Sequence, residues 1–483
     1  MNDERLVKQL TPKCEDFSKW YLELIRKAEL ADYAPMKGMM IIRPYGYAVW
    51  ENIQRLLDGR FKASGHVNAY FPLFIPESYL QKEAEHVKGF APEVAWVTQG
   101  GSEVLEERLA VRPTSEAIIG PTYAKWVKSY RDLPLLINQW ANVVRWEKVT
   151  RPFLRTTEFL WQEGHTVHES YEDAQAETLR ILALYKEFVE TELAIPVLAG
   201  QKSEREKFAG AQMTYAIEGL MSDGKALQMG TSHNLGQHFA KVFNIRFEDR
   251  AQVLQFAWQT SWGMSTRLVG ALVMAHGDDS GLVFPPRVAP VQAVIVPISV
   301  GNWRESVLPV AGKTRDDLAR AGVRVELDAR EEFTPGWKFS EYEMRGVPLR
   351  VEVGPRDVKQ GQVILVRRDT GKKEAAPLVS LVDVVPPLLE DIQRNLYEQA
   401  LAFRRENTRE VADFPAFKTV MEEKRGFIEG GWCGDETCED KVKDETMATI
   451  RVLPLEQPGD VANRPCVCCG RPSKMWAVFG RAY

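Results

Sequence analysis

Two pairs of adjacent prolines constrain the architecture of this chain more than any other feature. They lie in residues 284–290 and 384–388. Because proline has a fixed φ and no amide hydrogen, adjacent prolines interrupt both helices and β-ladders. The sequence therefore predicts three domains, over residues 1–288, 289–386 and 387–483. At 483 residues, the chain is long enough for each domain to bury a core.

The pattern before the first proline pair interleaves helices and strands irregularly. Apolar residues recur at helical spacing over residues 49–61 and 179–193, and residues 170–173 resemble a capping box at the start of the second helix. Residues 68–74 are typical of a strand that Pro72 ends or places at an edge. We expect an α+β domain around a mixed or antiparallel sheet.

The pattern between the two proline pairs is more regular, because strand-like and helix-like segments alternate. This alternation predicts a small α/β domain with a largely parallel sheet. The strands are expected at residues 292–298, 323–327, 349–353 and 363–367, and the helices at 305–321 and 338–345. A helical run and a cysteine-rich tail follow the second proline pair.

Composition excludes several classes of protein. The chain is 45% hydrophobic and 27% charged, which is typical of a globular protein and not of a disordered or fibrous one. It has no run of about 18 apolar residues, so no membrane span is expected. The first ten residues lack the apolar core of a secretion signal, so we expect a cytoplasmic protein. A net charge of −5 argues against a wholly basic surface, but a local basic face that binds RNA is compatible with it.

Five of the six cysteines follow residue 430. Cys433 and Cys438 form one closely spaced pair, and Cys466 and Cys469 form another. In a cytosolic chain, clustered cysteines favour metal binding over disulfides. Four thiolates can close a tetrahedral shell around a structural Zn²⁺. A set of free buried thiols is the alternative, and Cys468 could replace Cys469 as a ligand.

Residues 145–165 combine charged and aromatic side chains in a predicted β-hairpin. Arg145 and Glu147 are two positions apart, so a strand would point them to the same side. A guanidinium binds phosphate oxygens, an aromatic ring stacks on a purine, and a carboxylate accepts from an exocyclic amine. These groups suit a nucleoside triphosphate, although a hairpin with exposed ion pairs of little energetic weight is the alternative. One face of the returning strand should carry Phe159, Trp161, Glu163 and His165.

Three stretches resemble the sequence motifs of class II aminoacyl-tRNA synthetases. Arg145 and Glu147, followed by Arg155 and Phe159, resemble motif 2. Residues up to Pro72 resemble motif 1, which forms the dimer interface in that class and so implies a homodimer. The third stretch resembles motif 3, although a threonine stands where glutamate is usual; it reads Ser265, Thr266, Arg267 and then an apolar run.

More specific stretches resemble prolyl-tRNA synthetases of the archaeal/eukaryotic type. The resemblance covers essentially the whole chain, with every block in order. Residues 166–257 are too few for the large editing insertion of bacterial-type relatives. The matching stretches are RPTSE at 112–116, FLWQEGH at 159–165, KFAG at 207–210, GTSH at 230–233, TPGWK at 334–338, GPR at 354–356 and GRAY at 480–483.

This resemblance implies a fold and an activity. The first domain would have the class II synthetase fold, an α+β catalytic domain on a mostly antiparallel sheet. An α/β anticodon-binding domain and a small zinc-binding α+β C-terminal domain would follow. The implied reaction uses ATP and L-proline to form prolyl-adenylate, which then acylates tRNA(Pro). Mg²⁺ would accompany the triphosphate, but its protein ligands stay unassigned because Gln228 stands where the class often has an acid.

The resemblance also assigns roles to residues. Catalysis would depend on Arg145 and Arg267. Proline would contact Thr114, Glu116, Arg145, Trp161, Glu163, His165, Phe208 and His233. ATP would contact Arg145, Glu147, Arg155, Phe159, Gln228, Thr231, Ser265 and Arg267. The guanines shared by proline anticodons would contact Glu343, Arg350 and Arg356. A pocket for so small a ring discriminates weakly, so misactivation of alanine or cysteine is expected.

Less specific interpretations stay open at this point. Residues 114–116 are also typical of a helix N-cap, and His165 and His233 are compatible with purely structural roles. The three anticodon candidates are compatible with solvated surface charges. At the level of function, the alternatives are another class IIa synthetase, such as one for threonine, and an inactive RNA-binding paralogue. The apolar Trp161 and Phe208 disfavour the first, and the complete set of ATP residues disfavours the second.

Overall fold

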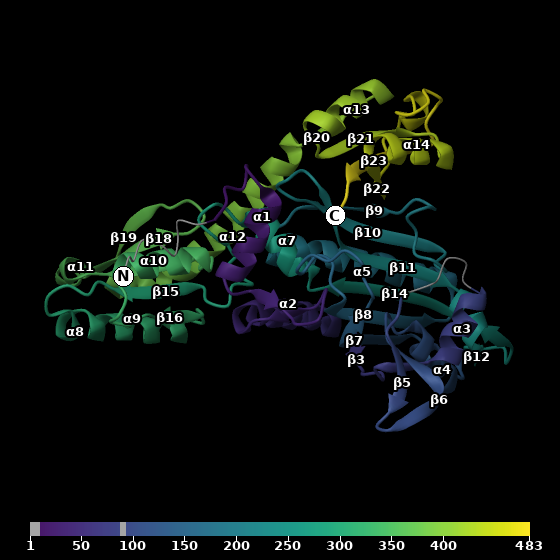
Figure 1. The fold of residues 1–483 in the computed structure, drawn as a ribbon, viewed down its shortest axis with the longest axis horizontal. Coiled ribbons are helices and arrows are strands. Elements are labelled where there is room, and N and C mark those ends of the chain that lie inside the picture. Colours follow the sequence, from purple (N-terminus) through teal and green to yellow (C-terminus); the bar gives the residue numbers. More distant parts are fainter. Residues whose placement is uncertain (1–9, 87–92) are drawn as a thin grey trace.

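One sheet of 11 strands runs through the first and the C-terminal domains of the chain (Figure 1). The computed structural model describes residues 10–86 and 93–483. The charged residues 1–9, on which the expectation of no secretion signal rests, lie outside the described residues. In spatial order the strands are β20 (Thr408–Glu410), β21 (Phe427–Trp432), β23 (Met475–Arg481), β22 (Ala448–Pro454), β9 (Val197–Gln201), β10 (Met213–Leu220), β11 (Ala226–Gly236), β14 (Trp258–Ser265), β8 (Glu158–His168), β7 (Leu135–Val144) and β3 (Val67–Asn68).

This sheet is mostly antiparallel, as expected for the catalytic domain. Only the outer pairs β20–β21 and β3–β7 are parallel. Strands β7 and β8 are the arms of the predicted hairpin and pair in continuous register from Leu135 opposite Val167 to Val144 opposite Glu158.

The prediction that Arg145 and Glu147 share a strand face is wrong. Both residues follow the end of β7, in the connection that leads to β8. The ladder ends there because the amide of Trp146 donates to the carbonyl of Glu93 (2.9 Å) instead of to the partner strand.

Helices cover the central strands and bury a large apolar core. Helix α5 (Tyr171–Glu192) packs along β9, β10, β11 and β14. Its predicted N-cap is confirmed, because the Ser170 hydroxyl accepts from the amide of Asp173 (3.1 Å). The helix predicted at residues 49–61 lies within α2 (Pro44–Ala63). The other helices of this domain are α1 (Phe17–Lys27), α3 (Glu77–His86), α4 (Glu116–Trp126), α6 (His238–Phe243) and α7 (Arg267–His276).

The single strand expected at residues 68–74 is instead divided between two sheets. Strand β3 ends at Asn68, and β4 (Phe74–Pro76) belongs to the sheet β4-β6-β5. Pro72 lies in the crossing, where no ladder requires an amide hydrogen. The remaining strands are β5 (Trp96–Gly100), β6 (Glu103–Val111), and the two-stranded sheets of β1 (Ala31–Tyr33) with β2 (Met40–Ile42) and β12 (Arg246–Glu248) with β13 (Leu254–Phe256).

The second domain has a five-stranded sheet in the order β16-β15-β17-β18-β19. Strand β15 is parallel to both neighbours, but β17, β18 and β19 pair antiparallel, so the prediction of a largely parallel sheet is only half right. The connections that precede β18 and β19 are too short for a parallel crossover. The elements are β15 (Ala293–Pro297), α8 (Trp303–Ser306), α9 (Leu308–Arg320), β16 (Val325–Leu327), α10 (Pro335–Met344), β17 (Leu349–Val353), α11 (Pro355–Lys359), β18 (Gln362–Arg367) and β19 (Lys373–Pro377).

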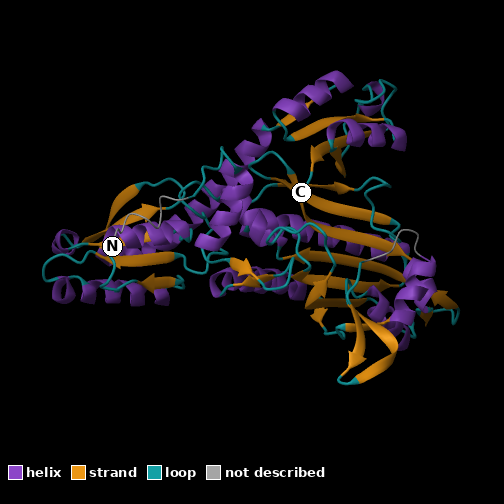
Figure 2. Cartoon of the chain, in the orientation of Figure 1, coloured by secondary structure: helices purple, strands orange, loops and turns teal. Residues whose placement is uncertain are grey.

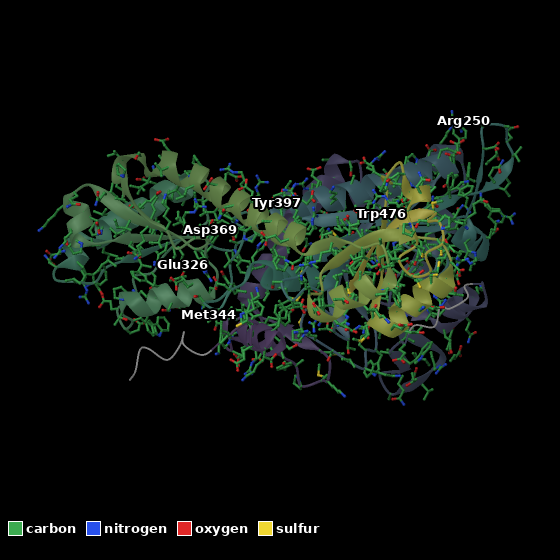
Figure 3. The ribbon with its side chains drawn as sticks, turned by 90° about the horizontal axis from the view of Figure 1, so that it is seen from above. Arg250, Glu326, Met344, Asp369, Tyr397 and Trp476 are labelled. Atoms are coloured by element: carbon green, nitrogen blue, oxygen red, sulfur yellow. The ribbon has the colours of Figure 1, made fainter. Side chains whose placement is uncertain are left out.

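The second proline pair does not interrupt the chain as expected. Pro386 and Pro387 lie inside the long helix α12 (Leu381–Glu406). They fall in its first turns, and beyond them Leu389, Ile392 and Leu396 bury an apolar face that supports the helix. Figure 3 places Tyr397 of α12 between Asp369 of the second domain and Trp476 of the third. The helices of the third domain are α13 (Phe414–Glu423) and α14 (Glu436–Thr446).

The C-terminal domain adds its strands directly to the sheet of the first domain. Leu453 of β22 pairs with Gln201 of β9, and Figures 1 and 2 show the two strands side by side. Gly200 permits this approach, because a Cβ there would lie 2.4 Å from the carbonyl oxygen of Leu453. Within residues 10–86 and 93–483, every helix is too short or too polar to cross a lipid bilayer.

Candidate active site

A cavity of about 240 Å³ opens on the central strands β8, β11 and β14. It contains all eight residues assigned to proline, of which Arg145 is also assigned to ATP, together with two further residues assigned to ATP, Gln228 and Thr231. Its lining comprises Thr114, Glu116, Arg145, Trp161, Glu163, His165, Glu206, Phe208, Thr214, Gln228, Thr231, His233, Ser261, Trp262 and Gly263.

The polar floor of the cavity contains two carboxylates and a histidine. Glu116 Oε1 lies 3.2 Å from His165 Nε2, and Oε2 accepts a hydrogen bond from the hydroxyl of Thr114. Glu163 accepts from the amide of Ser115 (3.1 Å) and the hydroxyl of the same residue. All of these side chains are buried.

These neighbours set the ionisation of the floor. Burial opposes the charge of Glu116, but the charge of His165 and hydrogen bonds lower the pKa of Glu116 to about 2. Burial likewise opposes the charged form of His165, but Glu116 and then Glu163 raise its pKa above the ordinary value. Burial raises the pKa of Glu163. The floor therefore holds an ionised Glu116 beside a protonated His165 at mildly acidic pH.

The triplet at 114–116 does not act as a conventional N-cap. Helix α4 begins at Glu116, and Ser115 occupies the N-cap position, but its side chain makes no capping hydrogen bond. The Ser115 hydroxyl instead binds Glu163 on β8. The N-cap alternative is therefore wrong for this side chain, and Thr114 and Glu116 point to the cavity.

Arg145 is a cation at the edge of the floor, where it is exposed and lines the cavity. Its Nε donates to the carbonyl of Pro113 (2.9 Å), and its guanidinium lies 5.2 Å from the ring of Trp161 and 5.5 Å from the ring of Phe159. No carboxylate forms an ion pair with Arg145 in the described part of the chain. Partial desolvation beside the cavity lowers the pKa of this guanidinium, but arginine stays charged in proteins. A cation that lines a cavity and has no carboxylate partner favours an anionic ligand.

Two further arginines extend the positive charge from Arg145. Arg267, at the start of α7, donates to the carbonyls of Leu154 (3.2 Å) and Gln228 (3.1 Å). Burial, followed by repulsion from Arg145, lowers its pKa. Arg155 is largely exposed.

The remaining ATP candidates surround these arginines. Glu147 lies 3.4 Å from Arg155 in an ion pair. Ser265, at the end of β14, accepts from the amide of Arg267 (3.2 Å). The Phe159 ring contacts Trp161 edge-on. Together with Gln228 and Thr231, all eight residues assigned to ATP therefore lie in the cavity or beside it.

An aromatic pair closes the apolar side of the cavity. The rings of Phe208 and His233 lie 4.8 Å apart, and His233 Nδ1 is 3.0 Å from the hydroxyl of Thr214. Burial lowers the pKa of His233 to about 4, so it is neutral at pH 7. The cavity thus has one charged side and one apolar side.

Sequence analysis missed five residues that line the cavity. Trp262 is directly opposite Gly164 of β8, and a Cβ on Gly263 would approach the carbonyl of Gln162 to 3.2 Å. For Ser261, Trp262 and Gly263, the available signal is the strand-like stretch 258–265, whose second half alternates large and small side chains; Glu206 and Thr214 have no such local signal. The five residues are Glu206, Thr214, Ser261, Trp262 and Gly263.

The anticodon candidates are only partly brought together. Glu343 and Arg350 form an ion pair (3.1 Å) and line a cavity of about 420 Å³ in the second domain. Arg350 also contacts the ring of Phe339 at 4.1 Å. Arg356 is exposed on α11 and does not line this cavity.

The four predicted cysteine ligands converge. The Sγ atoms of Cys433, Cys438, Cys466 and Cys469 all lie within 4.8 Å of one another. Cys433 Sγ is 3.7 Å from Cys438 Sγ and 3.8 Å from Cys469 Sγ. A zinc tetrahedron with bonds of about 2.3 Å has edges of about 3.8 Å, so the donor set fits Zn²⁺. Cys468 is not part of this group.

Comparisons with known proteins identify three consecutive family models. Residues 97–276 match the tRNA synthetase class II core domain (G, H, P, S and T), and residues 292–387 match the anticodon binding domain. Residues 414–483 match the C-terminal domain of prolyl-tRNA synthetase. The order of the three models is the one expected from the sequence.

Full-length relatives give the same result. A proline–tRNA ligase of Natranaerobius thermophilus is 57% identical, over 100% of this chain and 99% of its own. One from Rubrobacter xylanophilus is 58% identical, over 99% of each chain. The crystal structure of prolyl-tRNA synthetase from Cryptosporidium parvum, complexed with halofuginone and AMPPNP, has a TM-score of 0.93 and 42% identity and covers 98% of this chain and 99% of that chain. The chain therefore belongs to the prolyl-tRNA synthetases, within the class II aminoacyl-tRNA synthetases.

Proposed function

We propose that this protein activates L-proline with ATP and transfers it to tRNA(Pro) in the cytoplasm. The observation that carries the proposal is the cavity in which Arg145 lies between an acidic floor and two further arginines. Such a cavity can hold a zwitterion and a polyphosphate in contact. The names of the relatives and the nucleotide analogue in the Cryptosporidium structure support the same assignment.

Proline binds with its ammonium on the floor and its ring against the aromatic side. A secondary ammonium has two N–H donors, and the Thr114 hydroxyl and the Glu116 carboxylate are acceptors at the right place. Trp161, Phe208 and His233 enclose the pyrrolidine ring.

The floor holds the ammonium through Thr114 and Glu116, and it does not hold a metal ion. Glu116, Glu163 and His165 are close enough to be metal ligands. However, Glu163 is already occupied by Ser115 and by Gln139 Nε2 (2.8 Å). This arrangement disfavours the metal-assisted pocket expected of a threonyl enzyme.

Activation depends on position and charge. Arg145 contacts the proline carboxylate and the α-phosphate, and it stabilises the negative charge that develops as the carboxylate attacks. No general base is needed, because a carboxylate is already ionised at pH 7. Phe159 stacks on the adenine and Glu147 accepts from its amine. Arg155 and Arg267 hold the β- and γ-phosphates.

The rest of the ATP site is polar. Gln228, Thr231 and Ser265 complete the contacts to the nucleotide. Mg²⁺ neutralises part of the triphosphate charge and enters with it, and we assign it no protein ligand.

The other domains serve recognition and assembly. Glu343, Arg350 and Arg356 contact the anticodon of tRNA(Pro), and the four cysteines bind a structural Zn²⁺. The protein forms a homodimer through the β3 edge of the sheet. Val67 of β3 is 59% exposed and Tyr70, shortly after β3, is 70% exposed, and such exposed apolar side chains suit a protein partner.

Amino-acid-dependent ATP–pyrophosphate exchange tests this function. Untagged protein is assayed with proline, threonine, alanine and cysteine in parallel, because the C-terminal Tyr483 contacts Ala226 of the catalytic domain. We expect strong exchange with proline, weaker exchange with alanine or cysteine, and loss of exchange in Arg145→Ala. Arg250→Ala removes an exposed arginine that does not line the cavity and is the matched control; Figure 3 labels Arg250 at one end of the molecule. Folded protein that exchanges with no amino acid would support the inactive paralogue instead.

A further inference from the structure

The loop of residues 202–212 forms one wall of the amino-acid cavity. It joins β9 to β10 and contributes Glu206 and Phe208 to the lining. The loop has no regular secondary structure, and its few internal bonds include Glu206 N to Ser203 O at 3.2 Å. Its position must therefore depend on contacts from outside.

The first outside contact is a buried hydrogen bond from the C-terminal domain. The Ser203 hydroxyl donates to Glu439 Oε1 of α14 (2.6 Å), and the two residues are 2% and 4% exposed. Two positions further along the loop, Arg205 pairs with Asp440 and lies 3.8 Å from Glu436. Because residues three and four apart share a helix face, one acidic face of α14 holds the start of the loop.

A second contact comes from the neighbouring strand of the C-terminal domain. Lys202 Nζ donates to the carbonyl of Arg451 on β22 (2.8 Å) and to Glu218 Oε1 (2.7 Å). The Arg451 guanidinium donates to the same carboxylate oxygen (2.8 Å). It also lies 4.0 Å from Glu206, which lines the cavity.

We propose that the C-terminal domain sets the affinity of the cavity for the amino acid, by holding the 202–212 loop in the position that closes it. Ser203, Arg205, Glu439 and Arg451 are positioning residues in this proposal, and they touch no substrate. The inference rests on the proposed function, because it assumes that the cavity binds proline. It assigns to the C-terminal domain a role beyond zinc binding and stability.

The position of the 202–212 loop predicts different effects on the binding of proline and on the binding of ATP. The loop supplies the wall on the amino-acid side, through Phe208 beside His233. The residues assigned to the triphosphate lie on β11, at the start of α7 and in the connection between β7 and β8. Loss of the contacts to α14 should therefore weaken binding of proline and leave binding of ATP intact.

Steady-state pyrophosphate exchange with the full-length protein tests the proposal. In Ser203→Ala and Glu439→Ala, the KM for proline should rise about 3- to 10-fold, as expected for one lost hydrogen bond. The KM for ATP and kcat should stay unchanged. Glu439→Gln keeps an acceptor oxygen for Ser203 and should restore the wild-type KM.

Glu445→Ala is the matched control on the same helix. Glu445 pairs with Lys418 of α13 (3.1 Å) and not with the loop, so its removal should change neither KM. Equal increases in the KM for proline and for ATP, or no increase in Ser203→Ala, would overturn the proposal. If Glu439→Ala fails to fold, Ser203→Ala still tests the proposal, because Ser203 lies in the catalytic domain and its substitution leaves the C-terminal domain unchanged. Absence of proline-dependent exchange in the wild type would instead contradict the proposed function.

Discussion

At the scale of single residues, the cavity is organised around charges of opposite sign that lie close together. Glu116 and His165 are paired at 3.2 Å, while Arg145 has no carboxylate partner among the described residues. The ammonium group of a zwitterionic amino acid therefore has a complementary charge in Glu116, and its carboxylate group has one in Arg145. Burial makes this complementarity strong, because charges interact more strongly away from water.

Glu116→Gln tests the floor of the cavity at almost constant volume. The substitution removes the charge that raises the pKa of His165, so this pKa should fall. It also removes a charged acceptor for the ammonium, so the KM for proline should rise about 10- to 100-fold. NMR titration of His165 and pyrophosphate exchange measure the two effects. An unchanged pKa of His165 would contradict the assignment of the pair.

The same pair should make stability depend on pH in both directions. Because Glu116 has a lowered pKa, its contribution is full above its ordinary value of 4.5 and is lost as the pH falls towards about 2. Because His165 has a raised pKa, its contribution is full below its ordinary value of 6.5 and is lost as the pH rises through the raised value. The pair therefore stabilises the fold most between these two ordinary values.

At the scale of elements, the cavity depends on close packing between neighbouring strands. Gly164 of β8 is opposite Trp262 of β14, and the indole lies over the glycine. A Cβ on Gly164 would lie 2.1 Å from that ring. The floor of the cavity thus requires a residue without a side chain at this position.

Gly164→Ala should destabilise the protein by about 1–3 kcal/mol, because the added methyl displaces a buried indole. The KM for proline should also rise, since Trp262 lines the cavity. Urea denaturation gives the free energy of unfolding, and pyrophosphate exchange gives the KM. In Gly59→Ala, a helical control, nothing lies within 4 Å of the new Cβ, and stability should increase slightly. Equal effects of the two substitutions would contradict the packing argument.

Sequence analysis predicted the elements whose signals are local. The Ser170 cap and the apolar spacing of α5 depend on residues within one or two turns, and both are confirmed. The expected break at Pro386 is wrong, because an apolar face further along α12 compensates for the missing amide hydrogens. Arg145 was expected on a strand, but Trp146 binds the distant Glu93 instead. The outcome at these sites depends on contacts that no local pattern contains.

The residues of the site show the same division. Those in recognisable motifs, such as Glu116 and His165, were named from the sequence. Trp262 and Glu206 were missed, because they reach the cavity only through strand pairing and through a loop that another domain holds. These two residues can be assigned to the cavity only when the positions of the neighbouring strands and of the C-terminal domain are known.

At the scale of the whole molecule, the C-terminal domain is continuous with the catalytic domain. Strand β22 extends the catalytic sheet beyond β9. Lys202 and Arg451 hold the pKa of the buried Glu218 below its usual range, against the effect of burial. Removing Arg451 from this group would leave a buried carboxylate with one cation in place of two, which would lower the free energy of unfolding. Folding of the C-terminal domain and stability of the catalytic domain should therefore be coupled.

Cys466→Ser tests this coupling through the proposed zinc site. Because a structural zinc contributes directly to folding, loss of one ligand should release the metal and unfold the C-terminal domain. The exposed edge of β9 and the loss of Arg451 from Glu218 should then lower the melting temperature of the catalytic domain as well. Metal analysis and differential scanning calorimetry measure the two effects.

Cys468→Ser is the matched control, since Cys468 lies outside the group of four, and it should keep both the zinc and the wild-type melting temperature. Zinc loss in Cys468→Ser would show that Cys468 is a ligand, and an unchanged catalytic transition in zinc-free Cys466→Ser would show that the two domains are stable independently.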